Sequence, residues 1–362
     1  MEQEKSWGPR FLNRLPGIIA TSITTLIATF WIFWGTGEMY HEGWWGAWYN
    51  PLFYLIPGTV FLALALIALK WPRLGGWLTL VIGGAFTLFF LNPEIVDGRL
   101  TINWPIFIVS SPLILTGILF LVERHNRQKR QSEKKPSQRW WRRNLAYILV
   151  LAPPLLTFII MSANSLPIVL TRVDDGDRSA RLIEGNGVSL VWAPEGPGWN
   201  WKQPWGGYPS WHDIALYGKQ PVGMEDKPGY GQQDDDAWVF ASAEDMQTYT
   251  LCRYLSEDGL TLMGEPQDIW RMPTNDELVR SLGRHGENAG CTWDGESQKA
   301  TCDVRPDKES PLWASDKSPI YYWSADEYNE RYAHYVSYNG FVNWTLKSGG
   351  NPRHSYRCVK EP

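Results

Sequence analysis

The chain has 362 residues, which is long enough for more than one domain. Its formal net charge is −4 and its basic residues gather in one connection, which argues against the basic face of a nucleic-acid-binding domain. Two unlike halves follow each other: long apolar runs reach to about Leu170, and Gly, Pro, Trp and acidic residues dominate after it.

Five apolar stretches occupy the first half, and each has about the length that a helix needs to cross roughly 30 Å of hydrocarbon. They are residues 16–34, 52–69, 74–91, 105–122 and 145–170. Pro153-Pro154 predicts a kink in the fifth stretch. The sequence therefore predicts that residues 1–170 form a membrane α-helical bundle of five spans, with the lipid bilayer as its partner.

The charges of the connections predict the orientation of this bundle. The N-terminus and the second and fourth connections are basic, whereas the first has no Lys or Arg and the third has only Arg99. By the positive-inside rule, the N-terminus is cytoplasmic and everything after Leu170 is extracytoplasmic, in a multi-pass protein of the inner or plasma membrane. The basic connection around Arg127–Arg143 is read as a topology determinant; contact with anionic lipid headgroups is the alternative.

The second half is predicted to be a linker, residues 171–180, followed by one α+β domain, residues 181–362. Val188–Trp192 alternates like a first strand, and capping boxes at Ser242 and Thr274 predict two helices. Further strands are expected at Leu312–Ser315, Ile320–Ala325, Ala333–Tyr338, Gly340–Leu346 and Ser355–Lys360.

All four cysteines, Cys252, Cys291, Cys302 and Cys358, lie in the second half. An even number in one segment favours two disulfides in an oxidising compartment over four buried thiols. Four cysteines allow three pairings. We favour the nested one, Cys291 with Cys302 and Cys252 with Cys358, because the inner pair is close in sequence and the outer pair then joins the ends.

Three motifs carry a resemblance to a known family. They are Trp270-Arg271-Met272-Pro273-Thr274, Tyr322-Trp323-Ser324-Ala325 and Arg357-Cys358-Val359. Residues 181–360 resemble the C-type lectin fold, and more closely its formylglycine-generating-enzyme-like branch with the Legionella-collagen-like C-terminal domain. Met272 and Ala325 depart from the Leu and Ser of that branch. The branch includes the target proteins of diversity-generating retroelements, which implies that the last strands and loops could display diversified residues.

The resulting hypothesis is a surface-displayed binding protein without catalytic residues, whose ligand is an extracellular protein or a glycan. Tyr and Trp give rigid contact area, and Ser, Asn and Gly adapt their hydrogen bonds. The candidate ligand-binding residues are Tyr328, Tyr332, His334, Tyr335, Tyr338, Phe341, Asn343, Trp344, Asn351, His354 and Tyr356. Alternate strand positions face the core, so about half of them are expected to be structural. Trp270, Trp323 and Arg357 are assigned to the framework.

Two alternative functions remain. An oxidase like the formylglycine-generating enzyme would need reactive thiols with copper and an R-G-G-S-W type run, which the sequence lacks. A calcium-dependent lectin is suggested by Glu265-Pro266-Gln267, although this run lies before the second helix and not in the long loop, and no W-N-D run follows. The histidines are too scattered for a recognisable metal site. We therefore expect no cofactor, no metal and no enzymatic activity.

Overall fold

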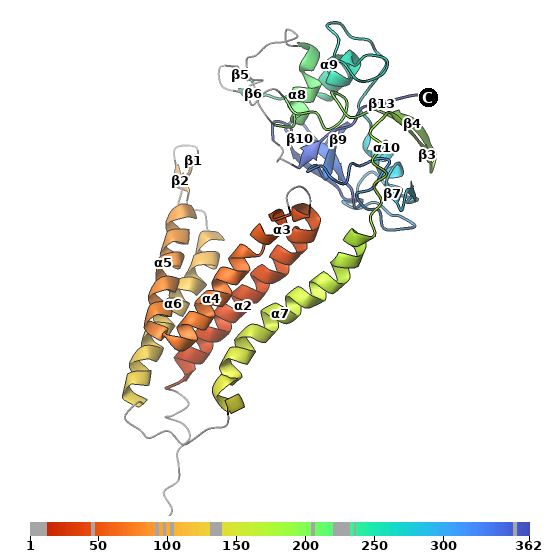
Figure 1. Cartoon of the computed structure of the whole chain (residues 1–362). Coiled ribbons are helices and arrows are strands. Elements are labelled where there is room, and N and C mark those ends of the chain that lie inside the picture. The colour runs from red at the N-terminus through yellow and green to blue at the C-terminus, as the bar shows by residue number, and fades with distance from the viewer. Residues whose placement is uncertain are drawn as a thin grey trace, which may run out of the picture. The chain divides into compact units, whose positions relative to one another are not determined.

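The structure is a computed structural model (Figure 1). It describes residues 13–44, 48–90, 94–96, 99–101, 105–130, 140–203, 207–219, 232–234, 237–349 and 353–362. The chain forms two compact units: unit 1 extends to Pro167, and unit 2 extends from Ile168 to Pro362. The two units are described separately.

Unit 1 is helical, with a two-stranded hairpin. Its helices are α2 (Leu15–Glu38), which continues as the π-helix η1 (Met39–Gly43), α3 (Asn50–Phe53), α4 (Ile56–Lys70), α5 (Pro72–Phe90), α6 (Pro105–Arg130) and most of α7 (Trp140–Leu170). The hairpin consists of β1 (Glu94–Val96) and β2 (Arg99–Thr101). A helix is present at each of the five predicted apolar stretches, and α7 is continuous through Pro153 and Pro154.

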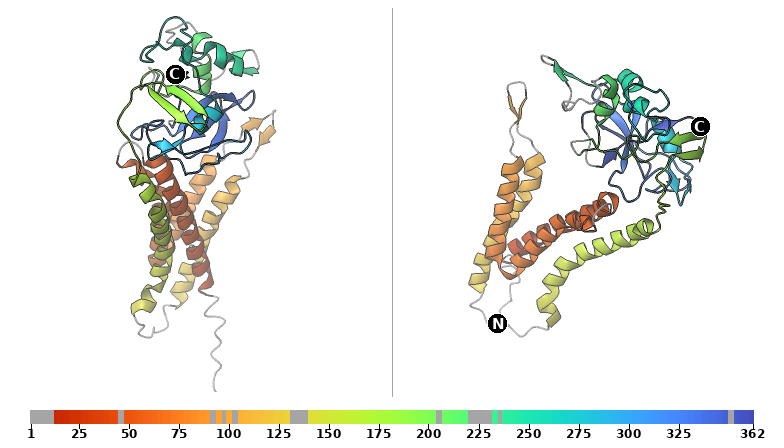
Figure 2. Two further views of the ribbon diagram at one scale, coloured as in Figure 1. Left: turned by 90° about the vertical axis from the view of Figure 1, so that its right-hand side faces the viewer. Right: turned by 45° about the horizontal axis from the view of Figure 1, so that its top comes forward.

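Helices α2, α4, α5 and α6 run side by side (Figures 1 and 2). Glycines let α5 and α6 approach closely: a Cβ on Gly117 would lie 2.9 Å from the Gly76 carbonyl oxygen. At one end of the unit, Ala20 of α2, Ala68 of α4 and Phe120 of α6 form a buried cluster. This cluster puts the first half of α2 beside the end of α4 and the second half of α6.

The predicted bundle of five membrane spans is wrong. Among the described residues, two helices are long and apolar enough to cross a membrane, Leu15–Gly43 and Asn144–Leu170. Helix α4 has 15 residues, about 22 Å at 1.5 Å per residue, which is short of roughly 30 Å of hydrocarbon. Helix α5 starts with Pro72-Arg73 and contains four glycines, and α6 is charged from Glu123 onward.

Unit 2 is an α+β unit built around a four-stranded sheet. The strand order is β11 (Val342–Leu346), β10 (Tyr332–Ser337), β9 (Tyr321–Glu327), β12 (His354–Ser355). Strand β10 is antiparallel to both neighbours, and β12 is parallel to β9. A second sheet has the order β13 (Val359–Lys360), β4 (Val188–Trp192), β3 (Arg181–Gly185). Strand β4 was predicted, whereas β3 was not.

The α-helices of unit 2 are short and begin at capping boxes. They are α8 (Trp211–Ala215), α9 (Ala243–Tyr249) and α10 (Asn275–Arg280), and the 3₁₀-helices η2 (Tyr217–Lys219) and η3 (Leu251–Tyr254) lie between them. The predicted caps Ser242 and Thr274 each accept a hydrogen bond from the third helical residue, and Ser210 does the same for α8. Short hairpins pair β5 (Gln232–Asp234) with β6 (Ala237–Val239) and β7 (Gly283–Arg284) with β8 (Glu287–Asn288). The predicted strand Leu312–Ser315 forms turns and irregular backbone instead.

The nested disulfide pairing is confirmed. Cys252 bonds to Cys358 and Cys291 bonds to Cys302, across 106 and 11 residues of sequence. The long-range bridge lies in the core of unit 2, beside buried Trp211, Trp270 and Trp323. In the chain-entropy model, closing a loop of this length contributes about 4–5 kcal/mol.

Candidate binding face

Three predicted ligand-binding residues meet on the four-stranded sheet. His334 of β10 is the register partner of Trp344 of β11, so their side chains share one face. The ring of Tyr328, just after β9, stacks on Trp344 with centroids 4.3 Å apart and planes at 10°. It meets His334 edge-on at 5.5 Å. Asn329 Oδ1 accepts from the Tyr332 amide at 3.0 Å, which closes the turn that carries Tyr328.

Trp293 completes this set from a distant part of the chain. Its ring centroid lies 5.9 Å from that of His334, and its Nε1 donates to the Ser297 carbonyl at 2.7 Å. The loop that carries it is closed by the Cys291–Cys302 disulfide. We call Trp293, Tyr328, His334 and Trp344 the aromatic cluster.

Sequence reasoning missed Trp293. The signal was its place in a short polar loop between two cysteines, where Asp294 forms a turn by accepting from the amides of Glu296 and Ser297. This loop hydrogen-bonds the sheet: the Val342 amide donates to the Gln298 carbonyl at 3.1 Å. The disulfide loop and the sheet therefore form one continuous surface.

The electrostatics of the aromatic cluster keep it neutral. Burial lowers the pKa of His334, although the carboxylate of Asp326 acts in the opposite direction. Burial also raises the pKa of Asp326, which accepts from the Asn275 amide at 2.6 Å. At neutral pH His334 is therefore an uncharged imidazole that can both donate and accept a hydrogen bond.

Three other predicted residues are at least partly exposed. Tyr332 is half-buried, and strand alternation puts it on the same face as His334. Phe341 is exposed, and the amine of Lys299 lies 5.6 Å from its ring. Asn343 is half-buried and accepts from the Trp344 amide at 2.9 Å. Asn351 lies outside the described residues.

Four predicted residues contribute to the core instead. Tyr338, His354 and Tyr356 are buried, so their assignment to a contact surface is corrected. Tyr335 is half-buried and packs against the core, with its ring 6.1 Å from that of Trp323 and 4.7 Å from that of His354. Burial lowers the pKa of His354 to about 3, so this histidine is neutral.

The residues assigned to the framework are buried, as predicted. Trp270, Trp323 and Arg357 are at most 1 % exposed. The guanidinium of Arg357 lies 3.6 Å from the Trp199 ring centroid and donates to the Ala193 carbonyl at 2.8 Å. Further bonds to the carbonyls of Pro311 and Leu312 tie the C-terminal segment to the loop before β9.

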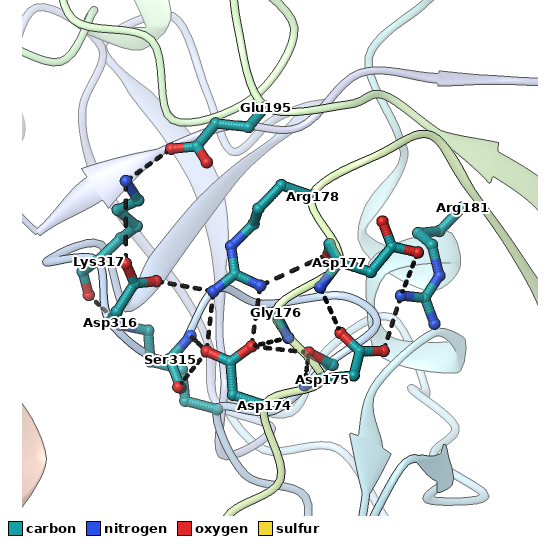
Figure 3. Close-up of polar contacts among 12 residues, drawn as sticks. Asp174, Asp175, Gly176, Asp177, Arg178, Arg181, Glu195, Ser315, Asp316 and Lys317 are labelled. Atoms are coloured by element: carbon teal, nitrogen blue, oxygen red, sulfur yellow. Dashed lines mark hydrogen bonds and ion pairs between the residues drawn. The ribbon is translucent and has the colours of Figure 1, made fainter.

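The predicted linker, residues 171–180, belongs to unit 2 and is hydrogen-bonded within that unit through most of its length. Asp174 receives two bonds from Arg178, at 2.9 and 2.8 Å, and one from the Ser315 hydroxyl at 2.5 Å (Figure 3). Arg178 also pairs with Asp316 at 2.8 Å. The Arg178 guanidinium holds the pKa of Asp174 well below its usual range.

The remaining acidic residues of this stretch are also paired. In Figure 3, Asp175 and Asp177 turn toward Arg181, at 2.8 and 3.2 Å. Arg172 forms a nearly buried ion pair with Asp307 at 2.8 Å. These carboxylates are engaged by arginines. Among the residues that the structure describes, no group of three or more His, Cys, Asp and Glu could hold a metal ion.

Comparison with known proteins gives one family match. Residues 4–135 match the model of a family described as a domain of unknown function, DUF7670. These residues include helices α2 to α6 and lie outside the second half of the chain. The search of curated proteins finds no match, and the search of solved structures finds none either.

Proposed function

We propose that unit 2 is a C-type-lectin-like binding domain, displayed outside the cell on membrane helices, and that the aromatic cluster contacts an extracellular protein. The observation that carries this proposal is the assembly on one surface of Trp293 from the disulfide loop with Tyr328, His334 and Trp344 from the region of β9 to β11. Tyr and Trp are enriched among the residues that dominate binding energy in protein interfaces.

The anchoring part of the proposal rests chiefly on α7. Many of its apolar side chains are exposed, including Leu149, Leu156 and Ile160, as expected of a helix surrounded by lipid. Its first turn contains Arg142-Arg143, whereas the segment just after it contains one arginine, Arg172, before Asp174-Asp175. Basic residues favour the cytoplasmic side, so this asymmetry orients unit 2 outward. Two disulfides favour the same oxidising side.

Rigidity supports a binding role for the aromatic cluster. Trp293 is held by the Cys291–Cys302 loop, and Trp344 and His334 are held by paired strands. Side chains that are already ordered lose little entropy when they bind a partner. A preformed cluster should therefore bind its partner more tightly than the same side chains would if they became ordered only on binding.

The stacking of Tyr328 on Trp344 favours a protein over a glycan as the ligand. Each ring covers one face of the other, whereas sugars stack on an open aromatic face. Protein partners can also contact the edges of aromatic rings and the tyrosine hydroxyl, which stay accessible when the ring faces are stacked. A glycan remains the second candidate because Tyr328 is 48 % exposed.

Diversification by a retroelement is a further part of this proposal. It rests on the resemblance of the motifs around Trp270, Trp323 and Arg357 to those of diversified target proteins. A nearby imperfect copy of the 3′ end of the gene, differing only where the copy has adenine, is the expected observation. A gene neighbourhood without such a copy would leave a binding domain of fixed sequence.

The proposal is tested by photo-crosslinking on intact host cells. A benzophenone amino acid replaces Tyr328 in the full chain, or replaces Leu260 as a control, because Leu260 is comparably exposed at 55 %. We expect a discrete adduct with one extracellular protein from position 328 and none from position 260. Equal adducts from both positions, or no adduct from either, would contradict the proposal. Adduct loss after enzymatic deglycosylation would favour a glycan ligand.

A further inference from the structure

The turn between α4 and α5 has an open pocket of about 440 Å³, lined by Trp71, Arg73, Leu74 and Trp77. The apolar side chains of this pocket are exposed: 52 % for Trp71, 48 % for Leu74 and 55 % for Trp77. Two exposed tryptophans within seven residues are too poorly buried to stabilise the fold of unit 1 by themselves. They form a surface available to a ligand.

Two cations flank this pocket. The Lys70 amine lies 4.3 Å from the centroid of the Trp71 ring, and Arg73 is exposed in the pocket wall. Within the described residues, neither cation forms an ion pair with a carboxylate. Arg127 is different, since it pairs with Glu123 at 2.9 Å and donates to the Leu69 carbonyl at 2.9 Å. Lys70 and Arg73 therefore give the pocket a net positive field.

The packing of unit 1 puts this pocket level with the start of α2. Ala20 of α2 and Ala68 of α4 lie in the same buried cluster. Leu15–Gly43 is one of the two described helices that could cross a membrane, and Arg14 precedes it. If α2 crosses the bilayer, its first turn lies near one headgroup layer, and the α4–α5 turn lies there too.

We propose that this pocket binds the headgroup of an anionic phospholipid. The inference rests on the membrane anchoring proposed above. Lys70 and Arg73 hold the phosphate, while Trp71, Leu74 and Trp77 contact the glycerol and the first acyl carbons. Tryptophan favours the interface between headgroups and hydrocarbon, and basic side chains there attract anionic lipid. The pocket would thus fix unit 1 at a defined depth in one leaflet.

The test is native mass spectrometry of the full chain in detergent, titrated with phosphatidylglycerol or with phosphatidylcholine of the same acyl chains. The wild type should retain phosphatidylglycerol in preference to phosphatidylcholine. K70Q/R73Q should lower phosphatidylglycerol affinity roughly thirtyfold, because each of the two cations near a membrane surface contributes about 1 kcal/mol. The control K299Q/R305Q removes two exposed charges from unit 2 and should leave this preference unchanged.

A second variant separates charge from apolar contact. W71L/W77L keeps both cations, so it should weaken binding of both lipids while the preference for phosphatidylglycerol persists. An unchanged preference in K70Q/R73Q, or equal loss in the control, would overturn the inference. Displacement of the lipid by equimolar inorganic phosphate would also overturn it, because the site would then be one for a free anion. Release of the wild-type chain from membranes by alkaline carbonate would instead refute the anchoring proposal.

Discussion

His334 and Tyr335 are neighbours in β10 with opposite roles. The ring of His334 joins the aromatic cluster, whereas that of Tyr335 packs against Trp323 in the core. Because successive strand residues point to opposite faces, one position along the strand separates a contact residue from a structural one. The sequence could predict the alternation but not its phase, since aromatic residues line both faces here.

The difference between the two faces can be measured with Trp344→Ala and Tyr335→Ala. Trp344→Ala removes the stacking partner of Tyr328 and should weaken ligand binding by about 2 kcal/mol, roughly thirtyfold. Its effect on the free energy of unfolding should stay within about 1 kcal/mol. Tyr335→Ala should instead destabilise unit 2 by about 2–4 kcal/mol, because it opens a cavity beside the core.

Crosslinking yield and thermal denaturation of the full chain check this pair of variants. The account of the aromatic cluster fails if Trp344→Ala leaves the adduct unchanged while the chain remains folded. It also fails if both variants destabilise the chain to the same degree.

Asp174 gives a pH-dependent prediction. The Arg178 guanidinium lowers its pKa in the folded state. The pairing therefore contributes its full stabilisation at pH values above the usual aspartate pKa of about 3.9. That stabilisation is lost as the pH falls through the lower folded-state pKa. Asp174→Asn should therefore lower the free energy of unfolding by about 1–2 kcal/mol at pH 7, and the difference from wild type should shrink below about pH 4.

Melting temperatures of the wild type and of Asp174→Asn, measured between pH 3 and pH 7, test this prediction. Glu257→Gln is a matched control, since Glu257 lies in a turn and carries no ion pair among the described residues. A gap between wild type and Asp174→Asn that stays constant across this pH range would contradict the assigned role of Asp174.

At the scale of elements, the two disulfides stabilise different parts of unit 2. Cys252–Cys358 joins the η3 helix to the C-terminal segment through the core, whereas Cys291–Cys302 shapes the loop that holds Trp293. Their pairing could be predicted because chain order alone suggested nesting. The position of Trp293 could not, because it depends on contacts between that loop and β11, about 45 residues further along the chain.

Replacing each pair with alanines should separate stability from binding. C252A/C358A should lower the free energy of unfolding by about 4–5 kcal/mol, and C291A/C302A should lower it by about 3 kcal/mol or less, because the second disulfide closes a shorter loop. C291A/C302A should lower the crosslinking yield at position 328 in chains that remain folded, because Trp293 loses its fixed position. A crosslinking yield in C291A/C302A equal to that of the chain with both disulfides would show that the loop does not belong to the binding surface.

The starts of α9 and α10 were predicted accurately because capping is local: Ser242 and Thr274 satisfy amides only three residues away. The start of α8 at Ser210 was not predicted. Helix ends were less predictable, since α9 stops at Tyr249 and continues as a 3₁₀-helix after Thr250. The five apolar stretches predicted helices correctly. The prediction of five spans from these stretches was wrong, because a short apolar helix such as α4 can be stabilised by packing against neighbouring helices.

At the scale of the whole molecule, the two units differ in what they expose. Exposed large apolar side chains are frequent in unit 1, among them Leu26, Phe30 and Val81, whereas unit 2 buries a large aromatic core. The family match falls on the helices before α7. This division fits an anchor joined to a displayed domain, and it predicts that unit 2 meets the extracellular solvent.

The most direct test labels the intact cell with a membrane-impermeant maleimide. Leu260→Cys adds one exposed thiol to unit 2, and the four native cysteines serve as an internal control because both disulfides protect them. The account predicts labelling of the Leu260→Cys chain without permeabilisation and no labelling of the wild type. Labelling of Leu260→Cys only after lysis, together with labelling of the native cysteines, would contradict an extracytoplasmic, disulfide-bonded binding domain.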